Sequence, residues 1–218
     1  YFSGDINITV DGREAAAIPP VDPPGQISNV QITVDPGPKF TFGRAQIAPL
    51  AEGTELPEGY ATGETASLGV LKSTVSAGVD GWRAQGHAKA ALSEQELTAN
   101  HPDRMVNAAL TLAPGPRLRF GPLLLEGESD VRPARIRAIA GLPEGEVFSP
   151  EEIRLSTERL RRTGAFSAVA LSEAEQIGPG DTLPITAQIV DAPKRRLGFG
   201  AELSTLEGLT LSAYWLHR

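Results

Sequence analysis

Cysteine is absent from this 218-residue chain, which excludes disulfides, thiol catalysis and zinc–thiolate sites. Aromatic residues are also few, at 6% against 40% hydrophobic residues, and this balance favours several modest cores over one large core. The chain lacks any run of about 18 apolar residues, so we predict no transmembrane helix. No signal peptide is expected either, because strand-like sequence begins at the first residue.

Basic residues are fewer than acidic residues, so the formal net charge is −7 and the pI is near 5.1. Nucleic-acid-binding domains are usually basic, so we expect no nucleic-acid partner. The three histidines, His87, His101 and His217, do not have the spacing of metal ligands. Gly198-x-Gly200 is not followed by a helical pattern, so it is no dinucleotide-binding loop. We therefore predict a protein without enzymatic activity, bound metal or cofactor.

Glycine (23) and proline (18) are plentiful by contrast, and several of them mark an internal repeat. Pro-Gly-Pro-Lys-Phe-Thr-Phe-Gly at residues 36–43 recurs 78 positions later as Pro-Gly-Pro-Arg-Leu-Arg-Phe-Gly, and a weaker copy begins at Pro193. Leu-Pro-Glu-Gly at residues 56–59 aligns with the same four residues at 142–145. Each copy predicts a strand, a turn, a helix that ends at glycine, and two closing strands.

The helix of the later repeat has clear start and stop signals. Ser149 and Glu152 have the spacing of a capping box, and Pro150 suits the first helical position. Gly164 can adopt the left-handed conformation that ends a helix. A short additional helix is predicted at residues 133–140, for which the earlier repeat has no counterpart.

The earlier repeat predicts one helix over roughly residues 65–85. Its apolar residues recur at helical spacing, and we expect them to face a sheet: Leu68, Leu71, Val75, Val79 and Trp82. Gly69, Gly78 and Gly81 interrupt this helix, and each is expected to weaken it by about 1 kcal/mol relative to alanine.

A strand with alternating apolar residues is predicted to begin within two residues of each helix-ending glycine. The chain itself begins in that frame, because residues 1–3 match residues 165–167. Residues 1–37 are therefore predicted to be the closing hairpin of a still earlier repeat. Such a hairpin is marginally stable alone and needs a neighbour to pack on.

The pattern changes after Pro193. Apolar and small or polar residues alternate over residues 197–204 and again over 209–216, with a turn at 206–208. This alternation is typical of membrane β-strands and also of an amphipathic hairpin on a soluble core, so both interpretations stay open. Tyr214 and Trp215 near one end suit an interfacial aromatic girdle.

Four segments resemble one family: Gly-Leu-Pro-Glu-Gly at 141–145, Phe-Ser-Pro-Glu-Glu at 148–152, Arg-Leu-Arg-Arg-Thr-Gly-Ala-Phe at 159–166 and Leu-Gly-Phe-Gly at 197–200. Together with the Pro-Gly-Pro joints, they resemble the polypeptide-transport-associated (POTRA) domains and barrel entry of the TamA family, within the BamA-like superfamily of outer-membrane assembly factors. The resemblance implies an α+β fold. Tandem POTRA domains (β-α-α-β-β, a three-stranded mixed sheet with helices on one face) precede the first β-hairpin of a transmembrane β-barrel.

The implied domains are the closing hairpin of a first POTRA domain at residues 1–37, a second domain at 38–115, a third at 116–192 and barrel strands at 193–218. The implied function is assembly of autotransporters and other β-barrel proteins in the outer membrane of a Gram-negative bacterium, with this region mainly in the periplasm. The implied partners are a TamB-like periplasm-spanning protein, unfolded outer-membrane clients, and outer-membrane lipid through the barrel.

The expected mechanism is β-augmentation, in which an extended partner adds to an exposed sheet edge through backbone hydrogen bonds. The candidate edges are the first strands after each helix. Their residues are Ala88, Lys89, Ala90, Ala91 and Leu92 in the earlier repeat, and Ser167, Ala168, Val169, Ala170 and Leu171 in the later one.

Two alternatives stay open. A two-partner secretion transporter would export one dedicated substrate and carry two POTRA domains where three are expected here. A soluble scaffold protein would use a POTRA module without a barrel, and continuing amphipathic strands after Arg218 would exclude it.

Overall fold

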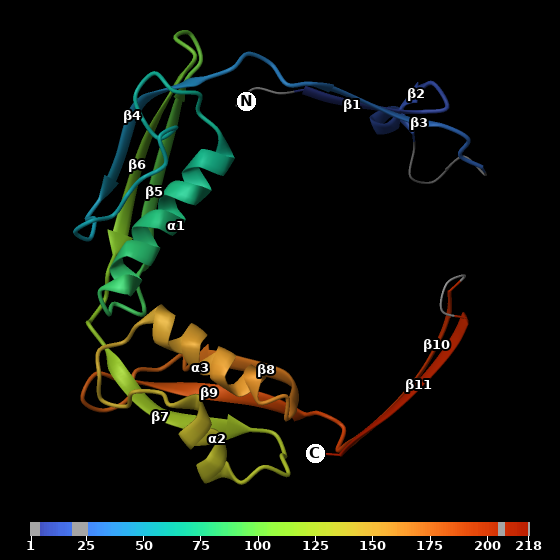
Figure 1. The fold of residues 1–218 in the computed structure, drawn as a ribbon. Coiled ribbons are helices and arrows are strands. Elements are labelled where there is room, and N and C mark those ends of the chain that lie inside the picture. The colour runs from blue at the N-terminus through green and yellow to red at the C-terminus, as the bar shows by residue number, and fades with distance from the viewer. Residues whose placement is uncertain (1–4, 19–25, 205–207, 218) are drawn as a thin grey trace. The chain divides into compact units, whose positions relative to one another are not determined.

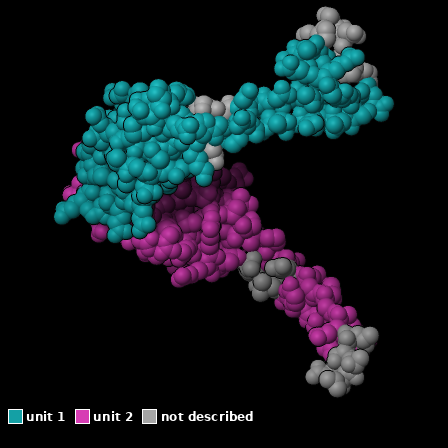
Figure 2. Space-filling view, turned by 90° about the horizontal axis from the view of Figure 1, so that it is seen from above, with its two compact units in different colours: residues 1–82, 90–114 teal, residues 83–89, 115–218 magenta. Residues whose placement is uncertain are grey.

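The computed structural model describes residues 5–18, 26–204 and 208–217. The chain forms two compact units, which Figure 2 distinguishes by colour. Unit 1 comprises residues 1–82 and 90–114, and unit 2 comprises residues 83–89 and 115–218. Residues 83–89 therefore pack with unit 2, although the sequence places them at the end of the earlier repeat.

The main sheet of unit 1 has three strands in the order β4-β6-β5 (Figure 1). The central strand β6 (Met105–Ala113) runs parallel to β4 (Thr41–Ala48) and antiparallel to β5 (Ala91–Asn100). One helix, α1 (Leu68–Ala84), covers one face of the sheet. The order is thus β-α-β-β. The single helix agrees with the helical pattern of this repeat, and the β-α-α-β-β order that the resemblance implied is wrong for unit 1.

Helix α1 faces the sheet with part of the predicted stripe, since Leu71 and Val75 pack on the core of unit 1. Leu68 is 63% exposed, so its predicted packing on the sheet is wrong, whereas Leu71 is buried as expected. Thr74 and Gly78 are the other buried positions of the helix. The stripe therefore consists partly of small residues, which let the helix axis lie close to the sheet.

We expect Gly78→Ala to destabilise unit 1 by about 1 kcal/mol, although alanine is the better helix former. A Cβ atom at Gly78 would lie 2.7 Å from Leu112 Cδ1 and 3.1 Å from Ile47 Cδ1. Gly69→Ala is the matched control in the same helix, because the nearest atom to its added Cβ is Ser67 Oγ at 3.8 Å. Urea unfolding should show stabilisation for Gly69→Ala; stabilisation by both variants would contradict the close packing.

The sheet of unit 2 has the order β7-β9-β8. Its central strand β9 (Thr182–Asp191) is parallel to β7 (Arg119–Glu126) and antiparallel to β8 (Phe166–Glu173). Helices α2 (Pro133–Ala140) and α3 (Pro150–Arg162) lie between β7 and β8 in the chain. The predicted β-α-α-β-β order is confirmed here.

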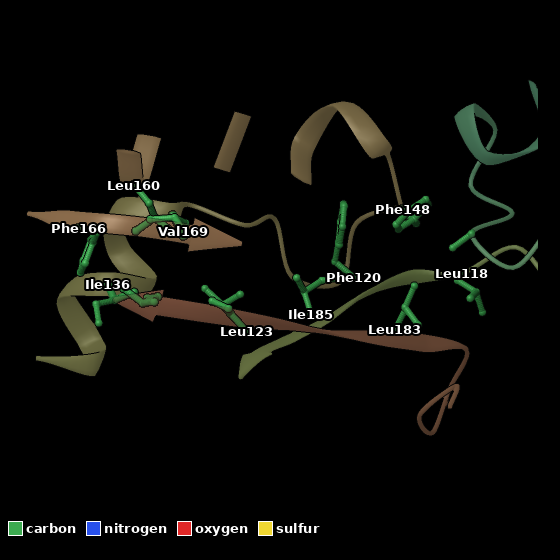
Figure 3. Packing of buried hydrophobic residues seen from close by; sticks show 14 residues of the cluster. Leu118, Phe120, Leu123, Ile136, Phe148, Leu160, Phe166, Val169, Leu183 and Ile185 are labelled. Atoms are coloured by element: carbon green, nitrogen blue, oxygen red, sulfur yellow. The ribbon is translucent and has the colours of Figure 1, made fainter. Parts of the chain in front are cut away.

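The core of unit 2 lies between this sheet and its two helices (Figure 3). Alternate residues of β9 are buried while those between them are more exposed, so the helices cover one face only. Side chains from five helices and strands and from the segments that connect them meet in this core, and they include Leu118, Phe120, Leu123, Ile136, Phe148, Leu160, Phe166, Val169, Leu183 and Ile185.

The ends of α3 match the prediction in part. Pro150 occupies the first turn, and Gly164 has the left-handed φ of 64° that ends the helix. The predicted capping box is wrong, because Ser149 makes no side-chain capping hydrogen bond. Glu152 instead lies 3.7 Å from Arg159 across two turns of the helix.

Unit 1 also contains a small N-terminal sheet in the order β2-β1-β3. Strands β1 (Asp5–Val10) and β3 (Val30–Asp35) pair antiparallel along their whole length, as the predicted hairpin requires. Strand β2 (Arg13–Glu14) pairs with the end of β1, and the 3₁₀ turn η1 (Ala15–Ala17) follows. Residues 1–3, which suggested the frame of this hairpin, lie outside the described residues, and its assignment to a POTRA domain stays a prediction.

The last two strands, β10 (Arg195–Ser204) and β11 (Gly208–His217), form an antiparallel hairpin. Leu197 pairs with Trp215 and Phe199 with Ala213, so the apolar residues share one face. That face is open, since Phe199 is 83% exposed. Most of the turn predicted at residues 206–208 lies outside the described residues. Among the described helices, none is both long and apolar enough to cross a membrane.

Candidate partner-binding edges

Each of the two larger sheets has two edges, β4 and β5 in unit 1 and β7 and β8 in unit 2. An edge strand presents backbone N–H and C=O groups that lack a neighbouring strand, and such groups can template pairing with another chain. Which of these groups already have partners decides where a partner strand could add.

The β7 edge is closed by the chain itself. The segment just before α3 runs antiparallel to the start of β7, and the two form an isolated bridge at Arg119 and Val147. Three backbone hydrogen bonds hold the segment: Phe120 N to Glu146 O (2.8 Å), Gly145 N to Phe120 O (2.8 Å) and Phe148 N to Leu118 O (2.9 Å).

Side chains continue this closure beyond a bulge in β7 between Phe120 and Leu123. The N–H of Leu123 donates to Glu144 Oε1 at 3.4 Å, and its carbonyl accepts from Arg137 Nε at 3.1 Å. The outward polar groups of β7 are therefore occupied as far as Leu123.

The β4 edge is closed in the same way. Phe42 N donates to Glu64 O at 2.8 Å, and Gly63 N donates to Phe42 O at 2.7 Å. The hydroxyl of Tyr60 donates to Gln46 O at 2.8 Å and lies 3.5 Å from Ala108 O of β6, so this contact lies between β4 and β6 and does not close the outer edge. Tyr60 is buried, and burial raises the pKa of its hydroxyl, which keeps it protonated as a donor.

These hydrogen bonds correct the alignment of the repeats. The backbone partner equivalent to Gly145 is Gly63, not Gly59, and both have left-handed φ values, 90° for Gly63 and 83° for Gly145. The signal that sequence reasoning missed is the run Gly-Glu-x-x-Ser, at residues 63–67 and 145–149. It ends in the serine that precedes each helix, and Ser67 Oγ accepts from Val70 N at 3.2 Å.

The β8 edge, in contrast, has few partners. Ala174 N donates to Pro184 O of β9 at 3.0 Å. Because the backbone groups of an antiparallel strand alternate in direction, the N–H and C=O groups of the even-numbered residues of β8 point toward β9. The odd-numbered residues, Val169 and Leu171 among them, present their N–H and C=O groups outward. The predicted residues Ser167, Ala168, Val169, Ala170 and Leu171 all lie in this strand, and none is charged.

Residues 83–89 contact the C-terminal end of β8 through two side chains. Pro184 has no N–H to offer the carbonyl of Ala174, and Lys89 Nζ donates to that carbonyl at 2.6 Å instead. Arg83 forms an ion pair with Glu173, the last residue of β8. The open part of the edge therefore lies before Glu173.

The other predicted edge begins later than expected. Strand β5 starts at Ala91, so the placement of Ala88, Lys89 and Ala90 on an edge strand is wrong. Ala88 is 1% exposed in the core of unit 2, and Ala90 is buried too. The reason is that the link between the repeats packs on unit 2 and does not extend the strand.

The remaining part of β5 is an edge, but it is less receptive than β8. Ala91 and Leu92 begin the strand, and a bulge follows between Leu92 and Glu94. Glu94 and Glu96 are exposed, and charges and bulges on an edge strand disfavour pairing with another chain.

In the part of the chain that the structure describes, no three His, Asp or Glu side chains are grouped to hold a metal ion.

A protein-family match covers part of unit 2. Residues 118–191 match the POTRA family, described as a surface antigen variable number repeat. The match starts one residue before β7 and ends with β9, so it covers the whole β-α-α-β-β unit. Residues 118–191 form a POTRA domain.

Solved structures share the fold of the chain. POTRA domains 3–5 of BamA from Haemophilus influenzae are 17% identical with a TM-score of 0.63, over 87% of this chain and 71% of that one. BamA from Haemophilus ducreyi lacking POTRA domains 1–3 is 19% identical with a TM-score of 0.60, over 81% of this chain and 34% of that one. A search of curated proteins returned no significant match. Because this chain spans about a third of the longer BamA chain, the activity and partners of a whole protein are proposals.

Proposed function

We propose that the chain is the periplasmic POTRA region of a non-enzymatic outer-membrane β-barrel assembly factor, and that it receives extended clients on β8. The observation that carries the proposal is the contrast between the two edges of the POTRA sheet. The outward groups of β7 already have partners from the same chain as far as Leu123. Strand β8 instead presents uncharged residues and outward backbone groups over Ser167–Leu171.

The hairpin of β10 and β11 supports the membrane part of the proposal. Leu197 and Phe199 on one strand and Leu211 and Trp215 on the other are each more than 60% exposed. A strand pair that offers one apolar face to its surroundings suits the start of a lipid-facing barrel wall. This hairpin also favours a membrane-embedded assembly factor over a soluble POTRA scaffold, and the form of it that we propose is a TamA-like protein with a TamB-like partner.

Leu171→Pro is expected to weaken binding of an extended peptide about three- to tenfold, because it removes one outward N–H that would donate to the added strand. Proline is tolerated here because this N–H does not pair with β9. The probe is a fluorescein-labelled peptide with the sequence of Gly208–His217, an alternating strand of the client type. Fluorescence anisotropy measures its dissociation constant with the whole chain.

Leu171→Ala is the matched control, since it removes the same side-chain contacts and keeps the N–H. Circular dichroism establishes that both variants are folded. Equal affinity of the folded proline variant and the alanine variant would remove the β8 edge as the docking site.

A further inference from the structure

One outward carbonyl of the β8 edge is occupied by a side chain. Arg161 Nη2 donates to the backbone carbonyl of Val169 at 2.9 Å. The side chain of Val169 is buried in the core of unit 2, so the position of its backbone is fixed. Arg161 itself lies in the last turn of α3, on the exposed surface.

The hydrogen bond is specific to this arginine among the basic residues of that turn. Arg159 donates to the carbonyl of Ala140 at 3.0 Å. Arg162 lies 3.5 Å from Glu158 and its side chain is 80% exposed. Of these three arginines, only Arg161 donates a hydrogen bond to β8 in the part of the chain that the structure describes.

A side chain also closes an outward carbonyl at the β7 edge, but there the N–H of the same residue, Leu123, is closed as well. At β8 the donor is a flexible and solvated side chain, and the next outward residue, Leu171, carries no such contact in the described structure. A strand that adds to β8 needs the carbonyl of Val169 as an acceptor, so it must displace Arg161.

We propose that Arg161 guards the β8 edge: its guanidinium occupies the Val169 carbonyl in the free protein and competes with an incoming strand. This inference rests on the proposed function, since a guard has meaning only where a strand adds. In the unbound protein, this hydrogen bond disfavours non-specific strand pairing at an edge that carries no charge. A client that pairs over several residues displaces the one side-chain hydrogen bond, whereas a short or irregular contact does not.

The test measures binding of the labelled Gly208–His217 peptide to the whole chain and to three variants. Arg161→Ala is expected to tighten binding about three- to tenfold, since the loss of one competing hydrogen bond frees the acceptor. Arg161→Lys keeps a charged donor with a different geometry, and its affinity for the peptide should lie between those of the unchanged chain and of Arg161→Ala. Arg162→Ala removes a neighbouring positive charge and should leave the affinity unchanged, which separates the guard from a general charge effect.

The outcomes separate this inference from the proposed function. If Leu171→Pro weakens peptide binding and Arg161→Ala leaves it unchanged or weaker, β8 is the docking edge and Arg161 is no guard. If neither Leu171→Pro nor Arg161→Ala alters binding, the docking edge itself is refuted. Equal tightening by Arg161→Ala and Arg162→Ala would show a charge effect and would overturn the guard.

Discussion

Gly121→Ala is expected to destabilise unit 2 by about 2–3 kcal/mol, because the added methyl group has no space beside β9. A Cβ atom at Gly121 would lie 2.9 Å from Pro184 N, 3.0 Å from Leu183 C and 3.1 Å from Pro184 Cα. All three are backbone atoms of the central strand, so relief requires β7 and β9 to separate. The gain of about 0.4–1 kcal/mol that alanine brings through the unfolded chain offsets only part of this cost.

Gly43→Ala is the matched control, since Gly43 holds the same place in the earlier repeat. Its Cβ would lie 2.7 Å from Asn107 Oδ1, but that atom ends a side chain that can rotate away. We expect Gly43→Ala to destabilise unit 1 clearly less than Gly121→Ala destabilises unit 2. Amide hydrogen exchange measured by mass spectrometry reports on each unit separately, through peptides of β9 for unit 2 and of β6 for unit 1. Equal losses in the two units would contradict the assigned role of the β9 backbone.

Arg83→Ala is expected to destabilise unit 2 by about 2–3 kcal/mol, because it leaves partly buried charged and polar groups without partners. Arg83 pairs with Glu173, and the two side chains are 25% and 18% exposed. Arg83 also donates to the carbonyl of Ala88 at 2.6 Å, and its guanidinium lies 5.4 Å from the ring centroid of Phe148. One side chain thus joins residues 83–89, the end of β8 and the segment that closes β7.

Arg154→Ala is the control for a surface ion pair. Arg154 contacts both Glu151 and Glu158, and its hydrogen bond lowers the pKa of Glu151, yet its side chain is 55% exposed. Exposed pairs contribute little, so the stability of unit 2 should not change measurably. The double variant Arg83→Ala/Glu173→Ala should recover part of the loss, because no carboxylate is then left unpaired. Hydrogen exchange in β9 distinguishes these cases; a loss for Arg154→Ala as large as for Arg83→Ala would exclude the partly buried pair as the cause.

The position of β8 at a sheet edge could be predicted from the sequence because its signal is local. Alternating residues follow the helix-ending Gly164, and the strand after a helix in a β-α-α-β-β unit lies at a sheet edge. The other candidate site was predicted only in part. Ala88 and Lys89 have the same alternating pattern, but they pack with unit 2, because the core there offers burial that periodicity does not reveal.

The sequence by itself determined the repeat, the order of strands and helices, and the amphipathic C-terminal hairpin, since each depends on periodicity and turn residues within one short segment. Only the tertiary structure decided which edges are open. The partners of Leu123 and of Val169 lie in other elements, and a hydrogen bond between them depends on how those elements pack. It also decided why glycine occupies position 121, because the atoms that exclude a side chain there belong to a strand about 60 residues later in the chain.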